Sequence, residues 1–481
     1  MITSQSSSSI TNWSGPPFGR GGALDQREAY VEASTRPKRK LVDNKVALPK
    51  NATDRAQVFA ELEKLHEVDT KWNEGRVFSL VYPMSDEHTE FLKKVYTLYF
   101  HENGLNPGAF PSLKKFESEV VSIAANLLGG GDTAAGAMTS GGSESIMMVV
   151  KTYRDWAAAT KQITAPEAIM PMTVHPAFDK ALHYFGIKSI KLPVDSGQRA
   201  DVAAVKKAIT PNTIFIVGSA PQYPHGVMDP IEDMAKLAKE HGIGMHVDAC
   251  VGGFMLPFLK KLGHAIPPFD FSVDGVTSIS ADLHKYAFTA KGASVVLYRD
   301  KDLRRFQFFV SKDWPGGLFA SPSVTGTRPA GSIVAAWATF QAMGEEGYLK
   351  LYRELFESVQ KFREGLIAAG FTIVGKPVGT LLAYESPQAN IHVIADLMEK
   401  RGWFVDRQMN PDSIHLTLTP AHAPIRDQYL RDLKECLTDA KAHPELAGEG
   451  MAAMYGMVAK IPDPSQIHQF LYQYMDQRYE T

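Results

Sequence analysis

Apolar residues recur at helical spacing in two stretches near the start of the chain. In the first, between residues 54 and 72, the recurring positions are Val58, Leu62, Leu65 and Val68. In the second they are Phe91, Val95 and Leu98. Because this spacing places side chains on one face of a helix, the two stretches predict an N-terminal helical segment.

From residue 110 onward, short apolar runs typical of strands alternate with amphipathic helical patterns. A helix is expected from Leu113 to Leu128, and the loop TSGGSES at 139–145 leads into another. The expected strands lie within 168–174, 189–194, 213–220, 242–249, 275–280 and 293–298. Strands that alternate with helices form βαβ units, so we expect an α/β domain over residues 110–340 with a mostly parallel sheet flanked by helices.

The pattern changes again toward the C-terminus. A long helical pattern runs from Ile333 to Leu366, and shorter β-like runs follow at 371–375, 380–386 and 414–419. We therefore expect a smaller α+β domain over residues 341–481. Residues 1–109 would form an N-terminal arm and helical segment, whose first fifty or so residues are either a mobile tail or an arm that wraps a partner subunit.

Composition narrows the class of protein. A chain of 481 residues is too long for one compact core, and its 44% apolar and 22% charged residues are typical of a soluble globular protein. With 51 basic and 53 acidic residues the net charge is -2, which provides no field to attract nucleic acid. Two cysteines argue against a disulfide framework, and no apolar run is long enough to span a bilayer. We expect a cytoplasmic protein whose partners are small molecules and other protein chains.

Three polar residues stand at the ends of expected strands, where ligands collect in α/β sheets. Lys285 follows the run at 275–280, Asp248 ends the run at 242–249, and His175 follows the run at 168–174. An aldehyde cofactor such as pyridoxal 5′-phosphate (PLP) needs an amine to hold it and a carboxylate to keep its pyridine nitrogen protonated. Lys285 and Asp248 suit these two needs, and His175 could stack on the ring. Burial and neighbouring positive charge are expected to lower the pKa of Lys285.

The loop at 139–145 supplies a cradle for the phosphate. It offers the backbone N–H groups of Gly142 and Ser143 and the hydroxyls of Ser143 and Ser145 at the start of an expected helix, where the helix dipole also favours an anion. Each of these residues has a structural alternative: a surface lysine, a capping carboxylate or glycine, or a hydrogen-bonded histidine. The combination is more specific than any member, and it indicates a PLP site.

Longer runs of sequence carry a resemblance to a known family. They are GSAPQYPHGVMDPIEDMAKLA, HVDACVGGF, FDFSVDGVTSISADLHKYAFTAKGASVVLY and FFVSKDWPGGLFASPSVTGTRPAG. These runs resemble the sphingosine-1-phosphate lyases, which belong to the group II decarboxylase-like branch of fold-type I PLP enzymes. The resemblance extends from about Arg76 to the segment at 450–457 and is strongest between residues 215 and 332.

The resemblance implies cofactor-binding roles for individual residues. Lys285 would hold PLP as a Schiff base, Asp248 would pair with the pyridine nitrogen, and His175 would be the stacking ring. Gly142 and Ser143 would bind the phosphate. The remaining matches are Gly326 and Thr327, which would complete the phosphate cradle from the other subunit of a homodimer, and His284 and His225, which would line the cofactor pocket.

The resemblance also implies substrate-binding positions, and here the sequence departs from the family. Tyr82, Asn103 and Lys291 match positions near the substrate phosphate and polar head. A histidine that the family places against the substrate phosphate is Asn106 in this chain, which can donate a hydrogen bond but carries no charge. Around Tyr82, the family's small-residue run SGAVY is FSLVY in this chain, and the usual Thr before the His-Lys pair is Leu283.

The resemblance implies a retro-aldol reaction. A phosphorylated long-chain amino alcohol would lose the proton of its hydroxyl, and its Cα–Cβ bond would break to give a fatty aldehyde and phosphoethanolamine. Lys285, His284 or a tyrosine such as Tyr82 could move the protons. An amino-acid decarboxylase on the same scaffold is the alternative, and a non-catalytic protein with a decayed site is a second. Retention of Lys285, Asp248 and His175 together argues against the second.

Overall fold

The structure is a computed structural model, and it describes residues 47–458 and 464–479. Contacts divide the chain into two units. Leu48–Pro444 form one unit, and the described part of the other holds the helices that follow residue 445. The predicted N-terminal arm lies almost entirely outside the described residues.

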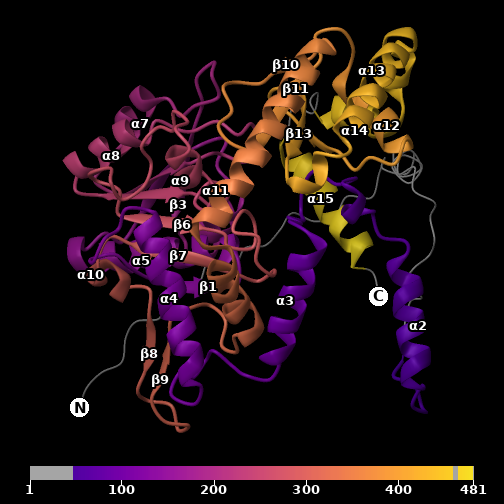
Figure 1. Cartoon of the computed structure of the whole chain (residues 1–481). Coiled ribbons are helices and arrows are strands. Elements are labelled where there is room, and N and C mark those ends of the chain that lie inside the picture. The colour runs from indigo at the N-terminus through magenta and orange to yellow at the C-terminus, as the bar shows by residue number, and fades with distance from the viewer. Residues whose placement is uncertain (1–46, 459–463, 480–481) are drawn as a thin grey trace, which may run out of the picture. The chain divides into compact units, whose positions relative to one another are not determined.

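A seven-stranded sheet forms the centre of the larger unit (Figure 1). Its strands are β1 (Ala135–Thr139), β2 (Glu167–Pro171), β3 (Lys188–Leu192), β4 (Thr213–Ser219), β5 (Gly244–Asp248), β6 (Ser278–Ala281) and β7 (Ser294–Tyr298). They lie in the order β1-β7-β6-β5-β4-β2-β3, and β7 alone runs antiparallel to its neighbours. The mostly parallel sheet expected from the sequence is confirmed, and each of the six expected runs overlaps a strand.

Alternate residues of the strands point to opposite faces of the sheet, and both faces carry apolar side chains that helices cover. The helices are α4 (Pro111–Leu127), α5 (Gly142–Lys161), α6 (Ala177–Tyr184), α7 (Val202–Ala208), α8 (Ile231–Glu240), α9 (Leu256–Lys261) and α10 (Lys301–Arg305). On β4, Phe215 and Val217 pack into a core with residues of α5 and α6. Gly218 faces the other way, where a Cβ would come within 2.7 Å of Ile231 on α8. Every residue of β4 is buried, as in a strand covered on both sides.

The polypeptide after residue 305 forms a hairpin, a long helix and a second sheet. The elements are β8 (Phe309–Ser311), β9 (Phe319–Ser321), α11 (Ala330–Ala368), β10 (Thr372–Ile373), β11 (Leu381–Glu385), α12 (Ile391–Lys400), β12 (Asp406–Gln408), β13 (Ser413–Thr417), η2 (Pro420–His422) and α13 (Arg426–Ala442). The second sheet is antiparallel in the order β10-β11-β13-β12. Gly344 has a left-handed φ of 56° and divides α11 into two helices at a kink. The domain boundaries expected at 109/110 and 340/341 stay predictions, and α11 runs across the second.

The N-terminal helical segment comprises α2 (Arg55–His66), η1 (Trp72–Glu74) and α3 (Asp86–Leu98). Asp54 caps α2 by accepting hydrogen bonds from two backbone N–H groups, and Ser85 caps α3. No residue of α2 is buried, and its apolar face is exposed: Val58, Phe59, Leu62 and Leu65. The period of the sequence therefore identified the helix, but its apolar stripe does not pack on the described part of this chain.

The second unit contains α14 (Gly450–Val458) and α15 (Pro464–Arg478), which follow η3 (Pro444–Gly448) along the chain. Across the described ranges, we find no helix with both the length and the apolar character needed to cross a membrane.

Candidate active site

A cavity of about 390 Å³ lies at the carboxyl ends of the strands of the large sheet. Six of the residues expected at a PLP site line it together: Lys285, His284, Asp248, His175, Gly142 and Ser143. They come from four separate segments of the chain: the turn after β6, the end of β5, the loop after β2 and the start of α5. The strand ends therefore bring these residues to one place, as their positions in the sequence predicted.

Lys285 is held in the cavity by an ion pair that the sequence analysis did not identify. Its Nζ lies 2.9 Å from Oδ2 of Asp282, whose side chain is 2% exposed. Burial lowers the pKa of Lys285, but the charge of Asp282 outweighs burial and holds the pKa well above its usual value. The expectation of a lowered pKa was wrong, because it counted burial and positive neighbours but not this carboxylate.

Asp248 ends β5 with a carboxylate that is fixed by its neighbours. Its Oδ1 accepts a hydrogen bond from the backbone N–H of Cys250 at 3.1 Å and from Oγ of Ser280 at 3.4 Å. Ser280 lies 3.2 Å from Nε2 of His246, whose Nδ1 lies 2.8 Å from Oγ of Ser278. Burial lowers the pKa of His246 to about 4, so this ring is neutral at physiological pH. A buried chain of hydrogen bonds through Ser280, His246 and Ser278 thus fixes the orientation of the Asp248 carboxylate.

The start of α5 forms a loop whose backbone comes close to the catalytic side chains. A Cβ on Gly142 would lie 2.9 Å from both Oδ2 of Asp282 and Sγ of Cys250, so no larger residue fits there. Ser143 lines the cavity. Ser145 does not, because its buried hydroxyl bonds to Oγ1 of Thr139 at 2.7 Å and to Oγ of Ser294 at 2.9 Å. The suggestion that the Ser145 hydroxyl contacts phosphate was therefore wrong.

The two cavity histidines present different ring atoms. Nδ1 of His175 accepts a hydrogen bond from the backbone N–H of Ala177 at 3.1 Å. Nδ1 of His284 lies 2.6 Å from the carbonyl oxygen of Ala293, to which it can donate, leaving Nε2 to accept a proton. Burial lowers the pKa of both rings, so both are neutral near pH 7.

Several expected site residues do not line this cavity. His225 is buried, with Nδ1 3.1 Å from Nε2 of Gln222, and burial lowers its pKa to about 4. Tyr82 packs edge-on against Tyr286, with 5.2 Å between the ring centres. Nζ of Lys291 lies 4.9 Å from the centre of the Tyr82 ring, so these two expected substrate residues are neighbours.

The segment before Tyr82 has a strained residue. Leu80 adopts a left-handed φ of 66°, which is unfavourable for a residue with a branched side chain, and its carbonyl oxygen accepts a hydrogen bond from Nζ of Lys291 at 2.6 Å. Leu80 is one of the three positions, 78 to 80, at which the sequence departs from the family's SGAVY run. Asn106 is exposed, and its Oδ1 accepts from the backbone N–H of Gly108 at 3.0 Å.

Asn103 lies against the loop 323–329, which carries Gly326 and Thr327. Its Nδ2 donates to Oγ1 of Thr327 at 3.3 Å, and its Oδ1 accepts from the backbone N–H of Arg328 at 3.1 Å. Neither Gly326 nor Thr327 lines the cavity of the same chain.

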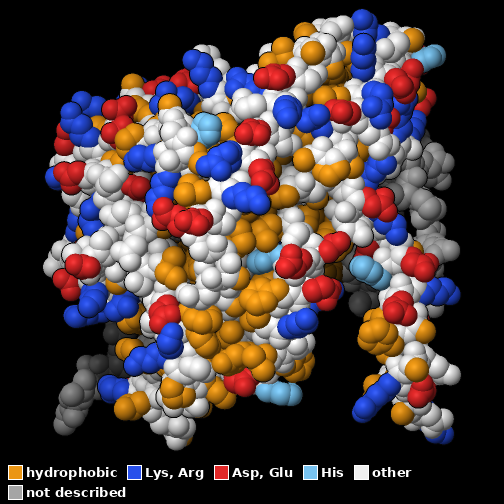
Figure 2. Space-filling view, in the orientation of Figure 1, with side chains coloured by type: hydrophobic (Ala, Val, Ile, Leu, Met, Phe, Trp, Pro, Cys, Tyr) orange, Lys and Arg blue, Asp and Glu red, His pale blue; other side chains and the backbone are white. Residues whose placement is uncertain are grey.

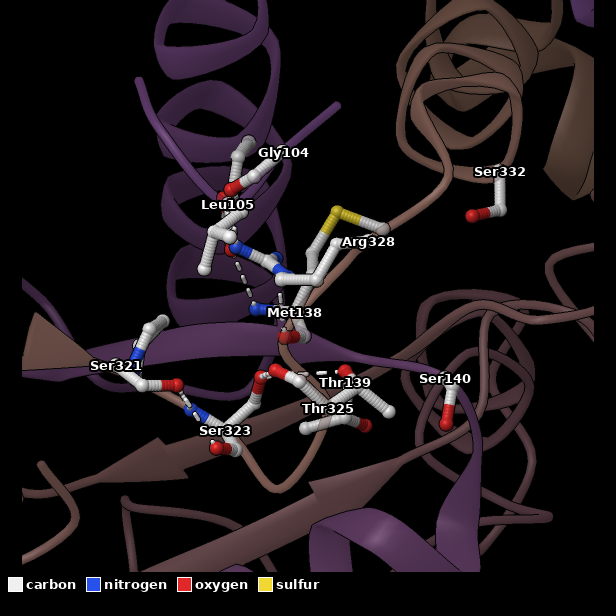
Figure 3. A network of polar contacts seen from close by, with 12 residues as sticks. Gly104, Leu105, Met138, Thr139, Ser140, Ser321, Ser323, Thr325, Arg328 and Ser332 are labelled. Atoms are coloured by element: carbon white, nitrogen blue, oxygen red, sulfur yellow. Dashed lines mark hydrogen bonds and ion pairs between the residues drawn. The ribbon is translucent and has the colours of Figure 1, made fainter. Parts of the chain in front are cut away.

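Arg328 fixes this loop to the body of the α/β domain. Its guanidinium donates to both carboxylate oxygens of Glu117 on α4, at 3.0 and 2.5 Å. It also donates to the carbonyl oxygens of Gly104 and Met138, each at 3.3 Å (Figure 3). Because Arg328 is 7% exposed, this bidentate ion pair is shielded from water.

The sequence analysis missed four residues of this region: Asp282, Glu144, Ser219 and Arg328. Asp282 directly follows a strand, so the rule that identified Lys285 could have found it as well. Ser219 ends β4 and lines the cavity, where its buried hydroxyl has no hydrogen-bond partner within the described chain. Glu144 and Arg328 act through backbone groups of distant segments, and no local pattern reveals such contacts.

The residues present fit the demands of PLP. An amine and a buried carboxylate line one cavity, the unpartnered hydroxyl of Ser219 lines it from the end of the adjacent strand β4, and a helix begins there with a glycine that has no space for a side chain. A mostly parallel α/β sheet with this set of residues at its strand ends defines a PLP-dependent enzyme of fold type I.

Comparison with known proteins narrows the class. Residues 37–385 match the family described as "Pyridoxal-dependent decarboxylase conserved domain". Sphingosine-1-phosphate lyase of Arabidopsis thaliana is 43% identical over 432 residues, covering 88% of this chain and 79% of that protein. Sphingosine-1-phosphate lyase 1 of Rattus norvegicus is 40% identical, covering 90% of this chain and 77% of that protein. The solved structure of a Burkholderia pseudomallei sphingosine-1-phosphate lyase aligns with a TM-score of 0.81 at 34% identity, covering 89% of this chain and 100% of that one.

The chain therefore belongs to the pyridoxal-dependent decarboxylase family, within its sphingosine-1-phosphate lyase branch. The resemblance and the fold class inferred from the sequence are both confirmed.

Proposed function

We propose that this chain uses PLP held by Lys285 to cleave the Cα–Cβ bond of a phosphorylated long-chain amino alcohol such as sphingosine 1-phosphate. The products are a fatty aldehyde and phosphoethanolamine. The observation that carries the proposal is the presence of Lys285 and Asp248 in one cavity of a chain that is 43% identical to a sphingosine-1-phosphate lyase.

The cofactor, when bound, supplies an electron sink for the carbanion left by bond cleavage. The amine of Lys285 holds its aldehyde. Asp248 would accept a hydrogen bond from the pyridine nitrogen, and its orientation is fixed by Ser280 and the Cys250 backbone N–H. His175 would stack on the ring, and Gly142 and Ser143 would donate to the phosphate from the start of α5. The unpartnered Ser219 hydroxyl is available as a further donor within the cavity.

Proton transfer needs an acceptor for the substrate hydroxyl proton. His284 supports this role because its ring is neutral near pH 7 and its Nδ1 is engaged by Ala293, which leaves Nε2 with a free electron pair. Tyr82 serves as a donor instead, since burial raises its pKa to about 12 and keeps the phenol protonated. Lys285 is the third candidate, and its pairing with Asp282 favours the ammonium form.

The substrate phosphate would be held by Lys291, Asn103, Asn106 and Tyr82. Lys291 is the charged member of this set, because Asn106 supplies only a neutral amide. Recognition would therefore depend on Lys291 more strongly than in relatives that carry a histidine at the position of Asn106.

A homodimer is part of the proposal. Gly326 and Thr327 are exposed and do not line the cavity of their own chain, which suits a contribution to a second site. Hydrophobic side chains also gather on the surface over α3, α4 and the adjacent part of α11 (Figure 2). The exposed ones include Phe91, Leu98 and Phe100, a surface that a second copy would cover. The two buried free cysteines support a reducing, cytoplasmic location.

The test is an assay of products. Incubation with sphingosine 1-phosphate should release fatty aldehyde, whereas an amino-acid panel should release no carbon dioxide. Carbon dioxide without aldehyde would instead establish a decarboxylase. The holoenzyme should show a visible absorbance band that Lys285→Ala removes. A wild-type protein without this band would refute the proposal that the chain is a PLP enzyme.

A further inference from the structure

Glu144 connects the phosphate-binding start of α5 to the loop 323–329. Its side chain lies in the first turn of α5 and is 7% exposed. Oε2 accepts from the backbone N–H of Ser140 at 2.7 Å. Oε1 accepts from the backbone N–H groups of Val324 at 3.0 Å and Thr325 at 3.1 Å, and lies 3.4 Å from the Thr325 hydroxyl. One carboxylate thus binds two loops that are separated by about 180 residues in the sequence.

The other end of loop 323–329 is held by Arg328. Its guanidinium is paired with Glu117. It is also bonded to the carbonyl oxygens of Gly104 and Met138 (Figure 3). Met138 is the residue before Thr139 in β1, so this contact lies at the strand that leads into the phosphate-binding loop. Two buried charged side chains therefore fix the loop at both ends.

Between these anchors, the loop presents two backbone N–H groups outward. Gly326 and Thr327 are exposed, and neither N–H has a hydrogen-bond partner within the described residues. A Cβ on Gly326 would meet nothing within 4 Å, which shows that the space in front of it is open. The loop is anchored at its ends and has free donors at its tip, as a preformed anion-binding element would be.

We propose that Glu144 is a positioning residue for loop 323–329, and that it acts chiefly on the cofactor site of the partner subunit. This inference rests on the proposed function, in which Gly326 and Thr327 complete the phosphate cradle of the second copy. Most of the donors at the carboxylate belong to this loop, namely Val324 and Thr325. Glu144 sits beside the phosphate cradle of its own subunit while its charge holds the cradle of the other.

The chemistry of the contact requires a carboxylate. Each backbone group that faces Glu144 is an N–H donor, so both of its oxygens must accept. In Glu144→Gln the amide NH₂ would face an N–H donor on one side, and a buried donor would lose its partner. Glu144→Asp keeps the charge but is one methylene shorter, so it cannot reach both loops.

The first measurement is PLP affinity, followed by the absorbance of the lysine-bound cofactor. We expect Glu144→Gln to raise the dissociation constant of PLP about tenfold, which corresponds to the loss of one buried hydrogen bond. Glu167→Gln is the matched control, because Glu167, at the start of β2, is also a buried glutamate, 8% exposed, and bonds to Lys188 and Thr210 away from the cavity. It should bind PLP as the wild type does. An unchanged affinity in Glu144→Gln would overturn the proposal.

Mixed dimers then determine which site Glu144 serves. When a Lys285→Ala chain is paired with a Glu144→Gln chain, only the Glu144→Gln chain keeps Lys285. The loop 323–329 that its partner contributes is intact. We expect this site to bind within about threefold of a wild-type site paired with Lys285→Ala, since only a hydrogen bond to Ser140 is affected. When both substitutions lie on one chain and the partner is wild type, the single lysine site should show the tenfold loss. If PLP affinity is lost when Glu144→Gln lies on the chain that keeps Lys285, and not when it lies on the partner, the action on the partner is refuted.

The oligomeric state of the wild-type protein distinguishes a failure of the proposed shared site from a failure of the role of Glu144. If sedimentation finds a monomer that binds PLP fully, the shared site of the proposed function fails. If it finds a dimer and Glu144→Gln behaves as the wild type, the role of Glu144 fails alone.

Discussion

Nζ of Lys285 lies 2.9 Å from Oδ2 of Asp282, whose side chain is almost closed to solvent. Burial alone would favour the neutral acid, but the positive charge of Lys285, joined by that of His284 at pH values where its ring is protonated, outweighs burial and holds the pKa of Asp282 below its usual value. The same pair holds the pKa of Lys285 high. Because an amine must lose its proton before it attacks an aldehyde, Asp282 keeps Lys285 in place at the expense of its reactivity.

Asp282→Asn should therefore make the capture of PLP faster at neutral pH. Without the carboxylate, burial is the main influence left on Lys285, and its pKa falls. We expect the pH profile for the appearance of the cofactor absorbance band in apoenzyme to move to lower pH by about one unit or more.

The surface pair of Asp274 and Lys239 provides the control for this prediction. Asp274→Asn removes an exposed Lys–Asp contact of the same kind and should leave the profile where it was. A profile that stays fixed in Asp282→Asn would show that Asp282 does not govern the protonation of Lys285.

The core of the site could be predicted because strand ends converge. Lys285, Asp248 and His175 each follow a recognisable apolar run, and parallel strands place their carboxyl ends along one edge. β1 was missed because AGAMT is rich in small residues and contains no β-branched residue before its last position. Gly136 is needed there, since a Cβ would come within 2.2 Å of the Val296 carbonyl oxygen, a constraint that only the neighbouring strand imposes.

Contacts between distant loops could not be predicted. Glu144 looks like an ordinary residue of a first helical turn, and its role follows only from the position of Val324 and Thr325. His225 shares a run with residues near the cavity but is turned toward Gln222 instead. The apolar pattern in α2 correctly predicted a helix, but a single sequence does not reveal which surface packs on its apolar face.

Ser280→Ala should weaken PLP binding by a few-fold. This substitution removes the 3.4 Å hydrogen bond to Oδ1 of Asp248 and disconnects His246 from the carboxylate. Because the bond is long, we expect an increase of about threefold in the dissociation constant, with a change in the absorbance of the bound cofactor.

Ser278→Ala is the matched control for this second prediction. Ser278 lies on the same strand and contacts the other nitrogen of His246 at 2.8 Å, but it does not reach Asp248. Titration of both variants with PLP should separate them. Equal effects of the two substitutions would mean that the chain of hydrogen bonds supports the fold and not the orientation of Asp248.

Tyr82→Phe should lower kcat and leave PLP binding intact. The pKa of Tyr82 is raised to about 12 by burial, so its phenol remains a proton donor throughout the working pH range. Loss of one such donor typically reduces the rate about a hundredfold. The measurement is kcat for aldehyde release, with the cofactor absorbance as a check on the site. Full activity in Tyr82→Phe would remove Tyr82 from the catalytic residues.

Lys291 should make substrate binding sensitive to pH above neutrality. Burial, with repulsion from Lys285, lowers the pKa of Lys291 to about 8. The ammonium group is therefore charged at pH 7 and largely neutral at pH 9, whereas a phosphate monoester is already doubly charged above its second pKa of about 6. We expect KM to rise as the pH increases from 7 to 9. Lys291→Arg keeps its charge in this range, so its KM should stay level. The substrate's own titration is common to both proteins, so an equal rise in the two would show that Lys291 does not bind the phosphate.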